Sequence, residues 1–246
     1  MTQSSPVNNT LAPLRNVLAF KTMVQRLDDR TAGLPGMGCF YGPSGFGKTM
    51  ASIYCANAHG ACLVQVKSVW TQRALCEAIL AELGVKPERL VWRMVAQIGD
   101  ALAQANVPLI IDEADFLVQK KMIEIVRDIY EGSFVPVILI GEEALPSKLR
   151  QWERINSRML ERVQAEPIDE EDFGHLVKIR CPGLTLDARL GAAIRTASAG
   201  SARLIVNNLD TVRLRARTMG IQQVSLKDMG SVTLHDGKAP QMRRFG

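Results

Sequence analysis

The sequence predicts an α/β fold with a five-stranded parallel sheet, flanking helices and a small helical domain after the sheet. Short apolar runs, typical of strands buried on both faces, alternate with segments of helical period up to residue 167. From Ile168 onward only helical patterns remain. Alternating strands and helices favour a parallel sheet, whose functional groups gather at the carboxyl ends of the strands.

The sheet domain is expected over residues 14–167. An amphipathic pattern at residues 14–27 predicts one or two helices before the first strand. Strands are predicted from apolar runs at residues 37–41, 61–66, 107–111, 135–140 and 162–165. Helices are predicted between them at residues 50–56, 71–83, 87–102, 122–129 and 148–161. Thr71 and Pro87 supply helix start signals, and Gly84 a stop.

Three further segments complete the expected organisation. Residues 1–13 are polar and predict a disordered lead. Helices at residues 169–179, 188–199 and 201–217 predict a lid domain over residues 168–220. Residues 221–246 are expected to form a basic tail, because the chain from residue 203 onward has eight Lys or Arg against three Asp. That excess equals the net charge of +5 of the whole chain. The basic segment could bind the phosphates of a nucleic acid, or it could simply keep the protein soluble.

Composition favours a cytoplasmic protein with no membrane partner. Hydrophobic residues make up 47% of the 246 residues, yet no run approaches the roughly 18 apolar residues of a membrane span. The polar N-terminus lacks a secretory pattern. The five cysteines show no C-x-x-C pairing and are expected to be reduced core residues.

The strongest local signal is a glycine-rich loop between the first strand and its helix. Its residues fit the phosphate-binding pattern G-x-x-x-x-G-K-[ST]: Gly42, Pro43, Ser44, Gly45, Phe46, Gly47, Lys48 and Thr49. The strand–loop–helix context argues against a chance match in a glycine-rich turn. Backbone N–H groups from the loop to Met50 would point at the phosphates. Lys48 would reach the β- and γ-phosphates and Thr49 would bind Mg²⁺.

An acidic pair ends the third predicted strand. Asp112 follows a run of buried aliphatic residues and fits the role of a Mg²⁺ ligand beside the phosphate loop. Glu113 would face the γ-phosphate and polarise the attacking water. The pair favours ATP hydrolysis, with ATP and Mg²⁺ as ligands; a helix-capping acidic pair is the simpler alternative.

Together, these motifs and the helical lid resemble an AAA+ ATPase. The segment Gly200-Ser201-Ala202-Arg203 resembles the second sensor of that family, which implies that Arg203 reaches the γ-phosphate from the lid. The alternative is an ordinary arginine at a helix start.

The resemblance also implies an arginine finger supplied by a neighbouring subunit, which is worth roughly 10³–10⁵ in rate. Arg158 is the first choice, with Arg162 and Arg154 in reserve; surface ion pairs with Glu153 and Glu161 are the alternative. The sequence differs from the family pattern at the end of the fourth strand. The family usually has a polar residue there, the first sensor, whereas this chain has a glycine followed by Glu142, to which no role is assigned.

Within that family, most of residues 14–217 resemble the transposition ATPases related to the B protein of phage Mu. Leu139-Ile140-Gly141 with Leu145, and the segment from Lys67 to Thr71, carry this likeness. It implies a homo-oligomer, a ring or a filament, that binds double-stranded DNA without sequence preference and activates a transposase. Only about a dozen polar residues precede the core, so the core itself would bind DNA. Four basic residues are expected to contact the DNA backbone: Lys67, Arg73, Lys120 and Lys121. The alternative is that they are solvated surface cations.

Three alternatives remain open. A helicase loader or replication initiator would share every motif, and a nucleotide-gated scaffold would bind ATP with little turnover. A kinase is less favoured, because the lid shows no obvious acceptor pocket and Glu113 suits water as the acceptor.

Overall fold

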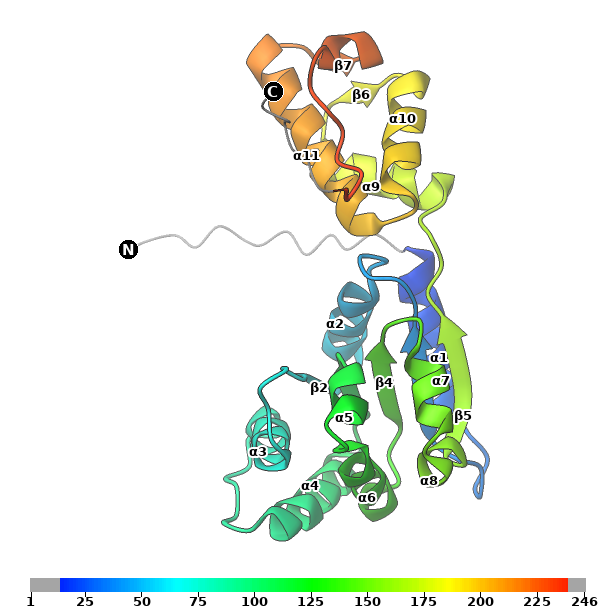
Figure 1. Cartoon of the computed structure of the whole chain (residues 1–246), viewed down its shortest axis with the longest axis vertical. Helices are drawn as coiled ribbons and strands as arrows, with labels where there is room; N and C mark the ends of the chain where they lie inside the picture. Colours follow the sequence, from blue (N-terminus) through cyan, green and yellow to red (C-terminus); the bar gives the residue numbers. More distant parts are fainter. Residues whose placement is uncertain (1–13, 239–246) are drawn as a thin grey trace, which may run out of the picture. The chain divides into compact units, whose positions relative to one another are not determined.

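The computed structural model describes residues 14–238 and divides into two compact units. Of the described residues, the core unit takes Asn16–Glu166, and the C-terminal unit takes the chain from Pro167 onward together with residues 14–15 (Figure 1). The predicted lead, residues 1–13, and the last part of the predicted tail, residues 239–246, lie outside the described residues. Within the described part, no helix is both long and apolar enough to span a membrane.

A five-stranded parallel sheet forms the centre of the core unit, which confirms the predicted fold class. The strand order is β2-β3-β4-β1-β5. The strands are β1 (Met37–Tyr41), β2 (Cys62–Gln65), β3 (Leu109–Asp112), β4 (Val137–Gly141) and β5 (Met159–Gln164). In this order β4 lies between β3 and β1, so the ends of these three strands bring the phosphate loop and the acidic pair to one edge of the sheet.

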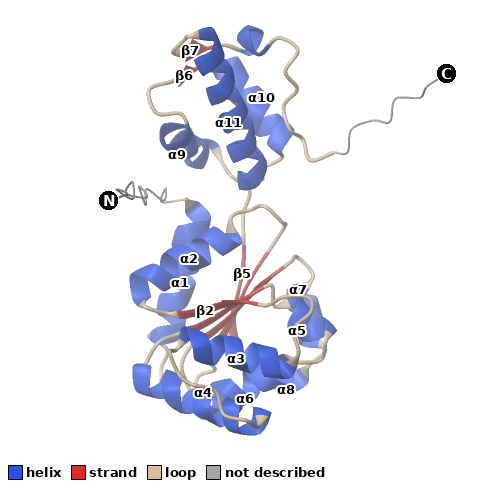
Figure 2. Ribbon diagram, turned by 90° about the vertical axis from the view of Figure 1, so that its left-hand side faces the viewer, coloured by secondary structure: helices blue, strands red, loops and turns tan. Residues whose placement is uncertain are grey.

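The two faces of the sheet are covered by different helices (Figure 2). One face packs against α1 (Arg15–Asp28), where Phe20 meets Phe40 of β1 edge to face. Alternate residues such as Met37 and Cys39 point to the other face and join the main apolar cluster. That cluster is closed by α3 (Gln72–Glu82), α4 (Val91–Ala105) and α6 (Ile123–Ser133). The alternation follows from the two-residue period of a strand.

The remaining helices of the core unit are α2 (Lys48–His59) and the shorter α5 (Asp115–Gln119), α7 (Leu145–Arg150) and α8 (Glu153–Asn156). The predicted helix at residues 148–161 was wrong, since α7 and α8 are separate and β5 begins at Met159 beside β1.

The helix expected to begin at Pro87 begins instead at Val91. The Gln97 side chain explains the delay, because it accepts from Glu88 N at 3.1 Å and donates to Lys86 O at 2.9 Å. Those bonds satisfy backbone groups of the connecting loop in a non-helical conformation.

The C-terminal unit packs α9 (Glu170–Arg180), α10 (Ala188–Ser198) and α11 (Ala202–Met219) around its own apolar cluster. Two short strands, β6 (Thr185–Leu186) and β7 (Gln223–Val224), pair in parallel, so the expectation of no strand after Ile168 was wrong.

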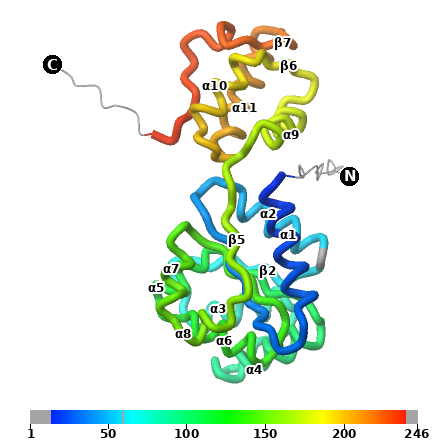
Figure 3. The backbone as a smooth tube through the Cα atoms, turned by 90° about the vertical axis from the view of Figure 1, so that its right-hand side faces the viewer, coloured from blue at the N-terminus to red at the C-terminus, as the bar shows by residue number. Residues whose placement is uncertain are grey.

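The chain beyond Gly220 is packed onto this unit. Val224 and Met229 are buried, the latter in the 3₁₀ helix η1 (Leu226–Met229). The segment after η1 then returns along α11 (Figure 3), where buried Asn208 donates to His235 O at 3.0 Å and accepts from His235 N at 2.7 Å.

Candidate nucleotide-binding site

The glycine-rich loop joins the end of β1 to the start of α2. Gly45 and Gly47 both have φ of 84°, a left-handed conformation that residues with a Cβ rarely adopt. Gly47 is the N-cap of α2 and provides no side-chain cap. The first N–H groups of α2 therefore lack a capping side chain, as suits a helix end that receives an anion.

Lys48 lies over this loop. Its ammonium donates to Gly42 O at 2.7 Å and to Pro43 O at 2.8 Å. Burial lowers the pKa of Lys48, while the carboxylates of Asp112 and Glu113 act in the opposite direction. A half-buried ammonium in a loop of backbone dipoles suits binding of phosphate oxygens.

Thr49 and Asp112 connect the phosphate loop to β3. The Thr49 hydroxyl donates to Asp112 Oδ2 at 2.7 Å, and Asp112 is only 3% exposed. These two oxygen groups are of the kind that Mg²⁺ prefers, and Mg²⁺ usually takes few protein ligands and completes its shell with phosphates and water. The residues present therefore fit Mg²⁺ with a nucleotide.

Glu113 has an unusual backbone conformation. Its φ is 57°, and its N–H donates to Asp112 Oδ1 at 2.8 Å. Burial raises the pKa of the Glu113 carboxyl, the charges of Asp112 and Asp115 raise it further, and the Lys48 ammonium lowers it. A non-glycine residue in the left-handed region is uncommon and often marks a functional position.

Two buried polar residues escaped the sequence analysis. Asn16 of α1, 4% exposed, donates to Phe46 O in the phosphate loop and to Glu166 O, each at 2.8 Å, and accepts from Glu166 N. Asp115, also 4% exposed, begins α5. The repeated Asp in Asp112-Glu113-Ala114-Asp115 could have drawn attention to it, whereas no local pattern distinguishes Asn16.

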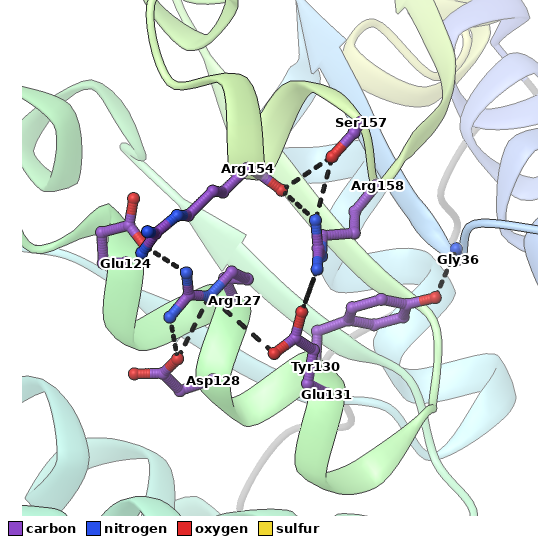
Figure 4. Close-up of polar contacts among 9 residues, drawn as sticks. All are labelled: Gly36, Glu124, Arg127, Asp128, Tyr130, Glu131, Arg154, Ser157 and Arg158. Atoms are coloured by element: carbon purple, nitrogen blue, oxygen red, sulfur yellow. Dashed lines mark hydrogen bonds and ion pairs between the residues drawn. The ribbon is translucent and has the colours of Figure 1, made fainter.

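Two of the three candidate arginine fingers, Arg154 in α8 and Arg158 just after it, lie beside α6 (Figure 4). Arg158 is fully engaged within its own subunit: Nε donates to Glu131 Oε1 at 2.8 Å, and Nη1 donates to Arg154 O and Ser157 Oγ at 2.9 Å. Its acidic partner is thus Glu131 of α6. Glu161, which the sequence suggested as a partner, pairs with Arg26 at 2.7 Å.

The two reserve arginines differ in environment. Arg162 donates to Asn156 Oδ1 at 2.7 Å, and Arg154 is exposed, with its side chain next to Glu124 in Figure 4. The action of any of the three on a neighbouring subunit stays a prediction.

Arg203 belongs to the C-terminal unit, where it lies in the first turn of α11. The Ser201 side chain caps this helix by accepting from Leu204 N at 3.3 Å. The predicted reach of Arg203 to the γ-phosphate therefore stays a prediction.

Three of the four candidate DNA-binding residues lie in neighbouring segments. Lys120 Nζ donates to Trp70 O at 3.1 Å, and Trp70 N donates to Lys67 O at 3.0 Å, so the end of α5 meets the turn after β2. Lys67, Lys120 and Lys121 are all exposed. Arg73 is engaged elsewhere, with Glu77 Oε1 and Arg89 O, each at 2.7 Å.

The parallel sheet, the phosphate loop and the acidic strand end define a P-loop nucleotide-binding domain. Residues 31–149 match the family described as AAA domain, so this part of the chain is similar to AAA-type P-loop ATPase domains. No curated protein matches the chain in sequence.

Solved structures share the fold at low sequence identity. Cdc6p from Pyrobaculum aerophilum is 14% identical with a TM-score of 0.63, over 92% of this chain and 68% of that one. The ORC1 protein of Aeropyrum pernix, solved in complex with DNA, is 17% identical with a TM-score of 0.61, over 87% and 62%. A RuvB mutant from Thermotoga maritima is 17% identical with a TM-score of 0.60, over 86% and 67%.

Proposed function

We propose that this protein is an ATPase that assembles with further copies of itself on double-stranded DNA and delivers that DNA to a transposase. The observation that carries the ATPase proposal is the Thr49–Asp112 hydrogen bond, with Glu113 held beside it. Lys48 and the loop N–H groups would hold the phosphates, Thr49 and Asp112 would hold Mg²⁺, and Glu113 would accept a proton from the attacking water. Bound Mg²⁺ would neutralise charge that develops on the phosphates.

Steady-state ATP turnover with and without duplex DNA tests this step. We expect Glu113→Gln to lower kcat by about 10²–10⁴, the usual contribution of a general base, and to retain ATP binding. Retained turnover in Glu113→Gln would refute the role of Glu113. Binding of ATP without turnover by the wild type would favour the scaffold alternative.

Oligomerisation is proposed because the ATP site would be completed by an arginine of a neighbouring subunit. Arg158 is the first candidate, and Arg203 would sense the γ-phosphate from the same subunit. Light scattering with Mg·ATP and DNA should show assemblies, and a monomer under these conditions would refute the shared site.

DNA binding is proposed for the turn after β2 and the end of α5. Exposed Lys67, Lys120 and Lys121 can contact phosphates, which carry no sequence information. Lys120→Ala/Lys121→Ala should reduce the slope of log K against log salt by about 2 in filter binding with ATP. The matched control is Lys178→Ala/Arg180→Ala, two exposed cations at the end of α9. Equal slopes in both variants would refute this surface.

The transposition role rests on the sequence resemblance, and a replication initiator or helicase loader is the second candidate. The likeness in fold to Cdc6p and to ORC1 solved with DNA supports the second candidate. Two experiments with a slowly hydrolysed ATP analogue separate them: electron microscopy of the protein with random duplex DNA, and co-purification of the protein with a replicative helicase. Continuous coating of the duplex favours target-DNA delivery, whereas a stable complex with a replicative helicase favours loading.

A further inference from the structure

Asp115 is a buried carboxylate that the roles proposed so far do not use. Both of its oxygens are engaged: Oδ1 accepts from Lys148 Nζ of α7 at 2.6 Å, and Oδ2 accepts from Glu142 N at 2.7 Å. A charge this deeply buried needs compensation by a partner and hydrogen bonds, and Asp115 has both. The pair thus joins the start of α5 to the segment that follows β4.

The neighbours of this pair belong to the catalytic edge of the sheet. Gly141, the last residue of β4, accepts from Gly42 N of the phosphate loop at 3.3 Å. Ala114 N, between Glu113 and Asp115, donates to Ile140 O at 2.8 Å. The ion pair therefore adjoins the phosphate loop on one side and the Glu113 backbone on the other.

Gly141 makes room for the pair. A Cβ at this position would overlap the Asp115 carboxylate and would lie 2.6 Å from Leu145 Cδ2. The end of β4 thus carries no polar side chain of its own and instead leaves space for a carboxylate from α5. Three segments thus contribute to this point: α5 provides the carboxylate, α7 provides the ammonium, and β4 leaves the space.

We propose that the Asp115–Lys148 ion pair is a positioning device for hydrolysis, which holds the turn at Glu113 and the first peptide after β4 in the geometry that catalysis needs. The turn needs such a constraint, because Glu113 has a φ of 57° and its carboxylate can act only where that strained turn places it. Asp115 anchors the turn two residues after Glu113, and Lys148 holds Asp115 from α7. This inference rests on the proposed ATPase function.

Four variants test it in the full-length protein. Lys148→Met removes the charge and keeps most of the side-chain length, and Lys148→Arg keeps a cation. Asp115→Asn keeps an acceptor for Glu142 N and removes the ion pair. The matched control is Lys86→Met, the same substitution at an exposed lysine of the core unit.

We expect Lys148→Met and Asp115→Asn to lower kcat by about 10- to 100-fold, as a displacement of about 1 Å does, with ATP affinity unchanged. Lys148→Arg should restore most of the rate, and Lys86→Met should behave as the wild type. ATP affinity is measured separately with a fluorescent ATP analogue, and thermal melts show whether each variant is folded.

The outcomes separate the two proposals. Absence of turnover in the wild type would refute the ATPase function itself. Wild-type kcat in folded Lys148→Met, or parallel losses of ATP affinity and kcat that Lys148→Arg does not restore, would refute the positioning role alone. If Asp115→Asn fails to fold, the kcat values of Lys148→Met and Lys148→Arg still test the positioning role.

Discussion

Asn16 is the residue whose removal should most directly loosen the phosphate loop. Its side chain makes three hydrogen bonds, all to backbone groups: Phe46 O, Glu166 O and Glu166 N, each at 2.8 Å. Asn16→Ala would leave these groups unpaired in a site where Asn16 is only 4% exposed. At about 1 kcal/mol for each bond, the loss is about 3 kcal/mol. The better helix propensity of Ala returns at most about 0.7 kcal/mol, so the net loss is about 2 kcal/mol.

For a unit of this size, that loss corresponds to a fall in Tm of about 4–8 °C. Thermal unfolding followed by circular dichroism measures it, and titration with a fluorescent ATP analogue should show weaker binding because the loop has lost its anchor at Phe46. Asn207→Ala, at an exposed position of α11, is the control. Asn16→Asp should be at least as destabilising as Asn16→Ala, because a carboxylate cannot donate to the two carbonyls. A Tm within about 1 °C of the Asn207→Ala value would refute this reasoning, since a loss that small is far below the loss calculated from the three bonds.

Three further predictions concern packing, thiol chemistry and the C-terminal unit. Gly99→Ala should lower the free energy of unfolding by up to about 2 kcal/mol, because its Cβ would lie 3.3 Å from the Gly132 carbonyl carbon of α6 and an overpacking cost of about 1–3 kcal/mol outweighs a gain of about 1 kcal/mol in helix propensity; urea unfolding measures it, and a gain in stability would contradict it. Burial raises the pKa of Cys39 to about 12, so the thiol should stay protonated at pH 8 and resist iodoacetamide until the protein is denatured; alkylation of folded protein, seen by mass spectrometry, would contradict this. Asn208→Ala should speed hydrogen exchange at the amide of His235, because the wild-type Asn208 side chain accepts a hydrogen bond from that amide at 2.7 Å. Unchanged exchange would show that this bond does not restrain the segment around His235.

The predicted parallel sheet was confirmed, and its central strands are the places where the local sequence pattern and the burial agree. Met37–Tyr41 and Leu109–Asp112 are short apolar runs that remain strands in the structure, and Thr71 caps α3 by accepting from Ala74 N. The predictions failed where a distant side chain decided the local conformation. Gln97 delays the start of α4 by holding the backbone of the preceding loop, and nothing near Pro87 in the sequence signals this.

The phosphate loop and the acidic pair could be recognised from the chain alone, because their chemistry requires particular residue types at short spacing. Sequence spacing could not show that Asn16 holds the loop, that Asp115 pairs with Lys148, or that Glu131 is the partner of Arg158. Each of these contacts joins residues at least 27 positions apart. Only the folded sheet and its helices bring such residues together, because a buried polar group takes whichever partner the packing places within hydrogen-bond distance. Local sequence thus indicated the candidate nucleotide site, and tertiary packing decided which side chains hold its segments in place.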